Sequence, residues 1–307
     1  MRWLVTRGVI CYLAICLILT IWQRDLIYHP KRTEKLSVSE SYLPKGMVHE
    51  ISYETADGLT INGWHLLRKG EVHHTPEACQ ASLDEGSPVV LFFHGNAGDR
   101  RGRVSYCDVF TNAGADVFVI DYRGFADSPG SPTETGLYED ARGLWNYATE
   151  DRGIDPSRIL IFGESLGGGV AVQLAHEVCQ AGTPPAGLIL RSTFSCIADA
   201  AGSHYPWIPT HLLVWDRFPS CETIGDVTCP VLVLHGTEDR IVPYELGQKL
   251  FAAVPESSAN DVPKQFITLE GADHNRLLDS HRNEFTQAVE QFLTSLPTAD
   301  MATKGAE

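Results

Sequence analysis

The stretch Arg158-Ile159-Leu160-Ile161-Phe162-Gly163-Glu164-Ser165-Leu166-Gly167-Gly168-Gly169 decides how this chain folds. An apolar run, a Gly-x-Ser-x-Gly turn and a run of small residues predict a buried strand, a sharp turn and a helix. Gly163 and Gly167 let strand and helix pack closely, so that the turn pushes the hydroxyl of Ser165 out of the sheet. The helix N-terminus offers backbone N–H groups to an anion. Ser165 is therefore the candidate nucleophile.

Apolar strands and helical segments alternate around this turn. We expect strands at 89–93, 117–120, 159–162, 188–190, 231–234 and 265–269, and helices up to 112 and at 136–149, 166–181, 245–254 and 278–293. Strands that are apolar throughout, separated by helices, predict a mostly parallel sheet covered on both faces. Asp57-Gly58 indicates a hairpin before this sheet, and residues 69–87 are expected to be a loop. Such sheets carry their sites at the carboxyl ends of the strands.

Length and composition indicate one large domain. The chain has 307 residues, of which 43% are hydrophobic and 21% charged. We expect a membrane segment at 1–24, an irregular linker at 25–47, a domain at 48–296 with an insertion at about 192–227, and a tail at 297–307. The net charge of −15 argues against a nucleic-acid partner, because no basic surface is evident to meet phosphates.

The N-terminal segment is typical of a membrane signal. Arg2 and Arg7 precede an apolar run over residues 9–22. The strictly apolar part is close to the length of a signal-peptide core, but no Ala-x-Ala cleavage pattern follows it. Counting residues 3–5 gives a span of about 20 residues, which is enough to cross a bilayer. We therefore predict an uncleaved, single-pass anchor. Basic residues lie on both sides of the run and leave its orientation open.

Ser165 needs a base, because a serine hydroxyl is a poor nucleophile at neutral pH. His274 follows the last predicted strand, and Asp239 follows the strand at 231–234. The order Ser, Asp, His is the one used by hydrolases with a Gly-x-Ser-x-Gly turn. Asp239 as a plain turn residue and His274 as a helix-capping surface residue are the alternatives, with Glu238 and Asp273 as substitutes for Asp239.

An oxyanion hole needs two backbone donors. The N–H of Leu166, next to the nucleophile, is one candidate. The N–H of Asn96, in the loop after the strand at 89–93, is the other, with Ala97 as its alternative. His94 and His235 each stand directly before a glycine at a strand end, and we interpret both as structural.

With these motifs the chain resembles the α/β-hydrolase fold and, within it, the Bem46-like and ABHD13-like serine hydrolases. The resemblance runs from about Leu26 to Leu293. Phe125-Ala126 departs from it, because Tyr-Gly or Phe-Gly is more usual there. Members commonly carry an N-terminal membrane anchor, and their substrates are poorly defined. Besides the Ser165, Asp239 and His274 motifs, the resemblance rests on His94-Gly95-Asn96-Ala97-Gly98, Asp121-Tyr122-Arg123-Gly124-Phe125-Ala126-Asp127-Ser128, Pro132-Thr133-Glu134 and Gly136-Leu137-Tyr138-Glu139-Asp140-Ala141.

The insertion between Ser192 and Val227 interrupts the alternation of strands and helices. By its position it is the cap that such hydrolases place over the nucleophile. Trp207 and Trp215 stand in its aromatic runs. Two interpretations stay open: the tryptophans line an apolar acyl site, or they hold the cap to the sheet.

The eight cysteines show no metal-binding spacing. A Cys196–Cys221 disulfide is permitted outside the cytosol, but free thiols packed as small apolar groups are favoured. We expect no metal and no organic cofactor.

The residues together predict a membrane-anchored serine hydrolase that cleaves an ester, thioester or lipid acyl bond. Its partners would be a small-molecule or lipid acyl substrate and the membrane, and the sequence does not indicate an oligomeric state. A peptidase of the serine-aminopeptidase type is the enzymatic alternative, because one fold hosts both activities. A non-catalytic membrane scaffold is the alternative from another class.

Overall fold

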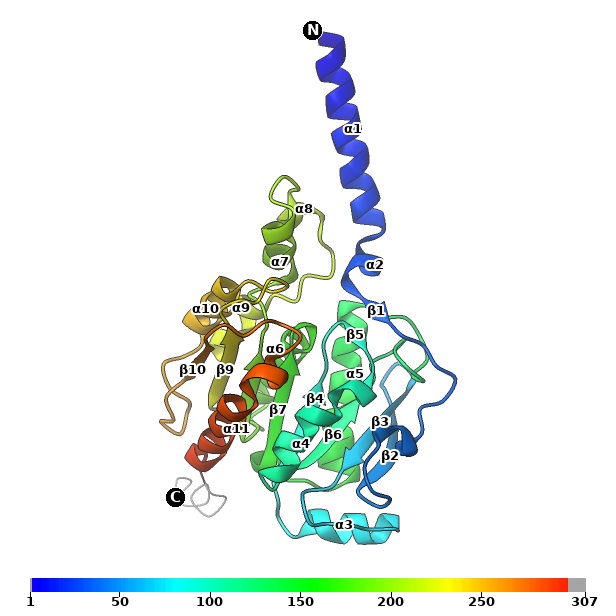
Figure 1. The fold of residues 1–307 in the computed structure, drawn as a ribbon, viewed down its shortest axis with the longest axis vertical. Coiled ribbons are helices and arrows are strands. Elements are labelled where there is room, and N and C mark those ends of the chain that lie inside the picture. The colour runs from blue at the N-terminus through cyan, green and yellow to red at the C-terminus, as the bar shows by residue number, and fades with distance from the viewer. Residues whose placement is uncertain (1, 298–307) are drawn as a thin grey trace.

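An eight-stranded sheet forms the centre of the computed structural model, which describes residues 2–297 (Figure 1). The strand order is β10-β9-β8-β7-β4-β6-β3-β2. The hairpin β2–β3 and the β3–β6 pair are antiparallel, and all the other pairs are parallel. The predicted mostly parallel sheet is confirmed. Its strands are β2 (Val48–Glu54), β3 (Thr60–Leu66), β4 (Val89–Phe93), β6 (Asp116–Ile120), β7 (Ile159–Glu164), β8 (Gly187–Arg191), β9 (Val231–Gly236) and β10 (Gln265–Leu269).

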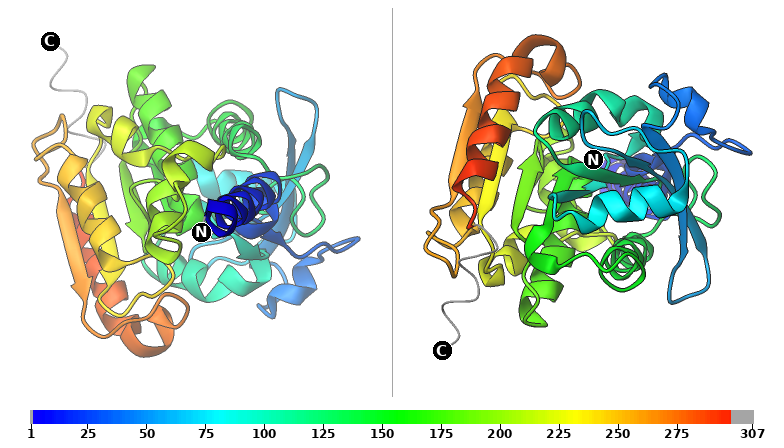
Figure 2. Two further views of the ribbon diagram at one scale, coloured as in Figure 1. Left: turned by 90° about the horizontal axis from the view of Figure 1, so that it is seen from above. Right: turned by 90° about the horizontal axis from the view of Figure 1, so that it is seen from below.

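Helices cover both faces of the sheet (Figure 2). The fully apolar strand β4 explains why, since Leu91 and Phe93 belong to one hydrophobic cluster and Val90 and Phe92 to the other. Because successive side chains point to opposite faces, each face needs its own apolar cover. The cluster of Leu91 includes α5 (Glu134–Asn146), α6 (Leu166–Gln180) and α10 (Tyr244–Ala253), and the cluster of Val90 includes α4 (Val104–Asn112) and α11 (Leu277–Ser295).

The helix α1 (Arg2–Ile21) projects away from the domain (Figure 1). It is long and apolar enough to cross a membrane, and Cys16 is its buried residue. The short helix α2 (Gln23–Ile27) follows it directly. The helices α1 and α11 (Leu277–Ser295) lie toward opposite ends of the molecule, and residues 298–307 of the predicted tail lie outside the described part.

The segment 25–47 differs from the irregular linker that we expected. It contains part of α2, the strand β1 (His29–Pro30) and the 3-10 helix η1 (Val38–Ser41). β1 pairs in parallel with the short strand β5 (Ala97–Gly98), and Tyr28 and Leu36 are buried. Burial of two large apolar side chains explains why this segment is fixed to the domain rather than free.

Buried charges hold the same segment in place. The Arg100 guanidinium donates to the carbonyl of Leu36 at 2.9 Å, and the Asp127 carboxylate accepts from the N–H of Leu36 at 2.9 Å. Ala126 accepts from the N–H of Thr33, and its φ of 44° lies in the left-handed region. A residue with a Cβ in this region carries a cost of about 1 kcal/mol, which the surrounding contacts must offset.

The segment 69–87 also differs from the expected loop. It contains the helix α3 (Pro76–Asp84), whose first turn is capped by the Thr75 hydroxyl. Proline at the first helical position and the buried side chains of Cys79 and Leu83 stabilise this short helix.

Three short helices lie between β8 and β9, in the part of the chain predicted to be a cap. They are α7 (Ile197–His204), α8 (Thr210–Leu213) and α9 (Ser220–Thr223). α7 and α8 extend beyond the sheet on the same side as α1 and α2 (Figure 1). The cap and the N-terminal helices therefore face each other across the carboxyl ends of the strands.

Candidate active site

Ser165 occupies a strained turn between β7 and α6, with φ 53° and ψ −114°. The turn is possible because the flanking residues are glycines. A Cβ on Gly163 would lie 2.5 Å from the carbonyl oxygen of Gly167, and a Cβ on Gly167 would lie 2.1 Å from that of Phe93. Strain of this kind persists only where the surrounding structure enforces it, and it clusters at functional sites.

His274 and Asp239 form a buried hydrogen-bonded pair. Their Nδ1 and Oδ2 atoms are 2.6 Å apart, and Oδ1 of Asp239 accepts from the N–H groups of Ile241 and Val242 at 3.0 and 2.8 Å. Burial acts to raise the pKa of Asp239, but hydrogen bonds from His235 and His274 outweigh it and hold the pKa far below its usual range. Asp239 is therefore an anion that fixes the Nδ1–H tautomer of His274.

The three predicted residues come from the ends of three parallel strands on one side of the sheet. Ser165 follows β7, Asp239 follows β9 and His274 follows β10, and the three side chains are almost fully buried. The substitutes for Asp239 are engaged elsewhere. Glu238 is exposed and faces Arg240, while the Asp273 carboxylate caps the backbone turn that follows it.

The two histidines that we interpreted as structural are fully buried. Nδ1 of His94 contacts the carbonyl of Gly95 at 2.7 Å, and His94 packs against Tyr122. Nε2 of His235 contacts the carbonyl of Val242 at 2.9 Å. Both side chains therefore support the backbone of site loops.

A buried charge network, which the sequence did not indicate, joins the nucleophile turn to the histidine loop. Glu164 lies 3.2 Å from Nη1 of Arg191 and 3.0 Å from Nε of Arg103. Arg191 also donates to the carbonyl of His274, and its own carbonyl accepts from the N–H of Ser165. Burial acts to raise the pKa of Glu164, but the charges of Arg103 and Arg191 outweigh it and lower the pKa. In the sequence, this network is visible only as a glutamate beside the nucleophile and an arginine at the end of β8, and neither residue by itself indicates an ion pair.

Leu166 and Asn96 lie beside Ser165 on the wall of the same cavity. Leu166 is the first residue of α6, so its N–H has no acceptor within the helix. The Asn96 side chain donates to the carbonyl of Ile27 at 2.8 Å, and its carbonyl accepts from the N–H of His29 at 2.8 Å. The segment after α1 therefore fixes the loop that carries Asn96.

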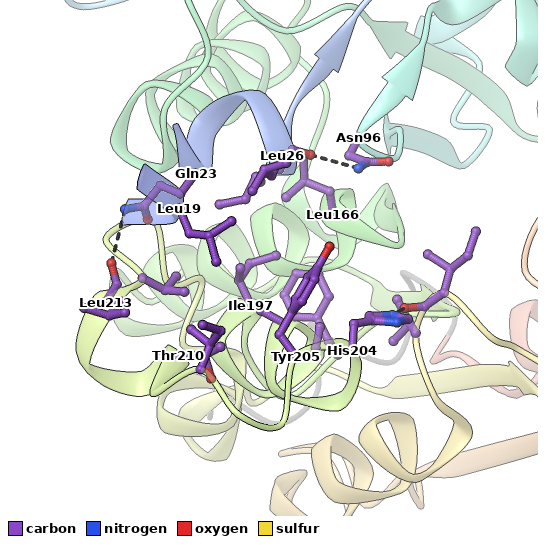
Figure 3. A pocket seen from close by; sticks show the side chains of 18 of the residues that line it. Leu19, Gln23, Leu26, Asn96, Leu166, Ile197, His204, Tyr205, Thr210 and Leu213 are labelled. Atoms are coloured by element: carbon purple, nitrogen blue, oxygen red, sulfur yellow. Dashed lines mark hydrogen bonds between the residues drawn. The ribbon is translucent and has the colours of Figure 1, made fainter. Parts of the chain in front are cut away.

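A cavity of about 510 Å³ opens over Ser165 (Figure 3). This volume is within the range of small-molecule sites, about 300–1,000 Å³. One wall comes from α1 and α2 and includes Leu19, Gln23 and Leu26; the facing wall comes from the cap. Gln23 joins the walls by donating to the carbonyl of Leu213 at 3.2 Å. The lining is mostly apolar and, among residues 2–297, includes no aspartate or glutamate. The sequence interpretation missed the wall from α1 and α2, because an anchor helix carries no signal of a binding site.

Trp207 and Trp215 do not line this cavity, contrary to the expectation for an acyl site. They are 54% and 57% exposed on the outer side of the cap. Smaller side chains, those of Ile197, Ala200 and Ile208, face the cavity instead. Both tryptophans lie in the irregular segments before and after α8.

The eight cysteines are all free thiols. Cys196, Asp199 and His211 place possible ligand atoms within 4.8 Å of one another in the cap. The Asp199 carboxylate there already accepts from the Lys249 ammonium at 2.6 Å. A cation would have to displace that lysine, so the cluster functions as an ion pair.

A nucleophile elbow, a histidine–carboxylate pair and a doubly covered parallel sheet together define a serine hydrolase of the α/β-hydrolase fold. The chain belongs to the prolyl oligopeptidase family, whose model matches residues 104–297. It is 38% identical over 291 residues to the uncharacterized protein Rv2307c of Mycobacterium tuberculosis, covering 94% of this chain and 93% of that protein.

Several of the relatives and solved structures that match this chain are named as lipases or esterases. The lysophosphatidylserine lipase ABHD12 of Danio rerio is 36% identical over 239 residues, which are 71% of this chain and 62% of that enzyme. The Pyrococcus furiosus esterase Pf2001 has a similar fold, with a TM-score of 0.63 at 16% identity over 88% of this chain and 97% of that one. The predicted fold and hydrolase class are confirmed, and these relatives support an enzyme that acts on ester bonds. The finer resemblance to Bem46-like and ABHD13-like enzymes stays a prediction.

Proposed function

We propose that this protein is a membrane-anchored serine hydrolase that cleaves the acyl ester bond of a lipid or a related long-chain ester or thioester. One observation carries the proposal: Ser165 stands on a strained turn at the floor of an apolar cavity, in the same set of strand ends as the His274–Asp239 pair. An apolar cavity selects an acyl chain, and the nucleophile at its floor meets the carbonyl at the end of that chain.

The chemistry follows from the roles of these groups. His274 takes the proton of the Ser165 hydroxyl as the serine oxygen attacks the carbonyl carbon. The Asp239 carboxylate stabilises the imidazolium that forms. The N–H groups of Leu166 and Asn96 hold the negatively charged oxygen of the tetrahedral intermediate. His274 then protonates the leaving alcohol or thiol, and water, activated by the same histidine, releases the acid from the acyl-enzyme.

A peptidase is the second candidate, and the family name favours it. An aminopeptidase must hold the ammonium group of its substrate, for which a carboxylate beside the scissile bond is the natural partner. The described lining of the cavity contains no carboxylate. The lipase names of the relatives and the apolar lining therefore favour an acyl ester over a peptide.

The helix α1 is proposed as the membrane anchor. It supplies Leu19 and Thr20 to the wall of the cavity, and α2 directly after it supplies Gln23. Cleavage as a signal peptide would remove part of this wall, which favours an anchor that stays attached.

Hydrolysis of a series of esters with increasing acyl length, measured on the purified full chain, tests the proposal. We expect the rate to rise with chain length and to fall by several orders of magnitude in Ser165→Ala. Ser280→Ala, which removes an exposed hydroxyl on α11, is the matched control and should behave as wild type. Labelling of Ser165 by a fluorophosphonate is expected, and its failure would favour the scaffold alternative. Faster turnover of matched amides than of esters would favour the peptidase.

A further inference from the structure

The cap carries several exposed apolar side chains in one short segment. We name residues 205–215 the cap tip. Within it, Leu212 is 83% exposed, Trp215 57%, Trp207 54% and Tyr205 44%. Trp207, Leu212 and Trp215 line no part of the cavity over Ser165. Aromatic and aliphatic side chains gathered on one exposed segment mark an interaction site rather than a solvated loop.

The cap tip lies directly beside α1. The Tyr12 hydroxyl donates to the carbonyl of Trp207 at 2.8 Å, and the N–H of Trp215 donates to Oε1 of Gln23 at 2.7 Å. Tyr12 precedes Ile21, the last residue of α1, by nine positions, which is about 14 Å along a helix. The cap tip therefore runs beside the C-terminal half of α1, so a bilayer that holds α1 also receives the cap tip.

The backbone of the cap tip suits an apolar environment. Pro206 and Pro209 have no N–H to satisfy. The N–H groups of Ile208, Thr210 and Leu212 donate to carbonyls within the cap tip itself. The carbonyl of Trp207, which this local pattern does not use, accepts from Tyr12. Bonding of this kind lowers the cost of placing an irregular segment at the boundary between headgroups and acyl chains.

The cavity opens between the same two elements. Leu19 of α1 lies on one side, and Tyr205 and Leu213 of the cap tip lie on the other (Figure 3). Tyrosine and tryptophan favour the boundary between headgroups and acyl chains, where a ring meets lipid and its polar atom meets water.

We propose that the cap tip is a second membrane-embedded element beside α1, and that an acyl chain enters the cavity sideways from the lipid leaflet between the two. The identity of the acyl chain that enters rests on the proposed function. The insertion of the cap tip into the bilayer does not depend on catalysis. The partner of this surface is a lipid bilayer.

Tryptophan fluorescence of the full chain in phosphatidylcholine vesicles tests the insertion without any substrate. The vesicles carry bromine atoms, which quench tryptophan on contact, at a shallow position of the acyl chains. We expect the double variant Trp207→Phe, Trp215→Phe to lose a clear part of the quenched signal. Trp145→Phe, which removes a buried ring of the domain, is the control and should leave the quenched signal unchanged. Equal quenching in wild type and the double variant would overturn the insertion.

Kinetics test the lateral entry. We expect Leu212→Glu to raise the KM for a long-chain ester embedded in vesicles at least about threefold, since burial of one leucine side chain in lipid is lost. Hydrolysis of a short, water-soluble ester should stay unchanged.

Val72→Glu is the matched control: Val72 is also exposed, and it precedes α3 at the opposite end of the molecule from α1 (Figure 1). An unchanged KM for the embedded ester in Leu212→Glu would overturn lateral entry. Absence of all ester hydrolysis in the wild type would refute the proposed function and leave the quenching result to decide on insertion.

Discussion

The floor and the upper walls of the cavity are built in opposite ways. The floor, with Ser165 and the His274–Asp239 pair, is held by a buried hydrogen bond and a buried ion pair between strand ends. The upper walls, from α1, α2 and the cap, are mostly apolar and meet through a few partly buried polar contacts such as Gln23 with Leu213. Buried paired charges fix atoms in one geometry, whereas apolar side chains on short helices adapt to what they cover. The comparison predicts that changes at the floor alter turnover and that changes in the walls alter substrate preference.

Asp239→Asn should have the largest effect. An asparagine amide can donate to Nδ1 and so favour the wrong tautomer of His274, which removes the base from Ser165. We expect kcat on a soluble ester to fall about 10³- to 10⁴-fold. Glu238→Gln makes the same chemical change on the exposed neighbouring residue and should leave kcat near the wild-type value. A larger loss of kcat in Glu238→Gln than in Asp239→Asn would mean that Glu238, and not Asp239, orients His274.

Glu164→Gln should weaken the floor as a structure. Breaking one partner of a buried ionic network costs about 3 kcal/mol at neutral pH. Because the pKa of Glu164 is lowered in the folded protein, its ionised form stabilises the fold above the unfolded pKa of about 4.3. This contribution is lost as the pH falls below that value through the folded pKa.

Urea unfolding in detergent micelles at pH 7 and at pH 4 measures the effect. The difference in unfolding free energy between wild type and Glu164→Gln should shrink at the lower pH. Glu290→Gln, on the exposed side of α11, is the control and should change stability little at either pH. A difference that grows on acidification would contradict the network described for Glu164.

Arg191→Lys should reduce turnover more than binding. The lysine keeps a positive charge for Glu164 but loses the forked geometry that also reaches the carbonyl of His274. A small displacement of a catalytic group costs roughly tenfold or more in rate. We therefore expect kcat to fall about tenfold with KM nearly constant, which marks Arg191 as a positioning residue.

Arg123→Lys provides the control for that experiment. Arg123 is another largely buried arginine, held by Asp57 and Asp140, and it contacts no site residue. Arg123→Lys should lower the free energy of unfolding without the selective loss of kcat expected for Arg191→Lys. Equal kinetic effects in both variants would reduce Arg191 to a structural role.

The floor was predictable from sequence because each of its parts sits in a short, continuous motif. The pattern around Ser165 carries strand, turn and helix in one stretch, and Asp239 and His274 each lie in the loop that follows a predicted strand. Arg191 was not predictable, because an arginine at a strand end is ordinary until its partner Glu164 is placed beside it in space.

The walls were not predictable for a different reason. Gln23 and Leu213 meet across 190 positions of sequence, and neither residue type signals a binding site. The expectation for Trp207 and Trp215 rested on composition. Both residues lie in irregular segments beside α8, where no helix or strand period indicates which way a side chain points.

Asp216→Asn should have the smallest effect and separates floor from wall most directly. The Asp216 carboxylate accepts from Nε of Arg24 at 3.0 Å and from the Tyr28 hydroxyl at 3.0 Å, and so ties the cap to α2. Arg24 is half exposed, so the ion pair contributes less than about 1 kcal/mol. We expect KM for a long-chain ester to rise about two- to fivefold and kcat for a short ester to stay constant. Asp226→Asn, an exposed carboxylate away from α2, is the control. An equal loss on both esters would mean that the walls also position the catalytic groups, and the separation between a rigid floor and adaptable walls would then fail.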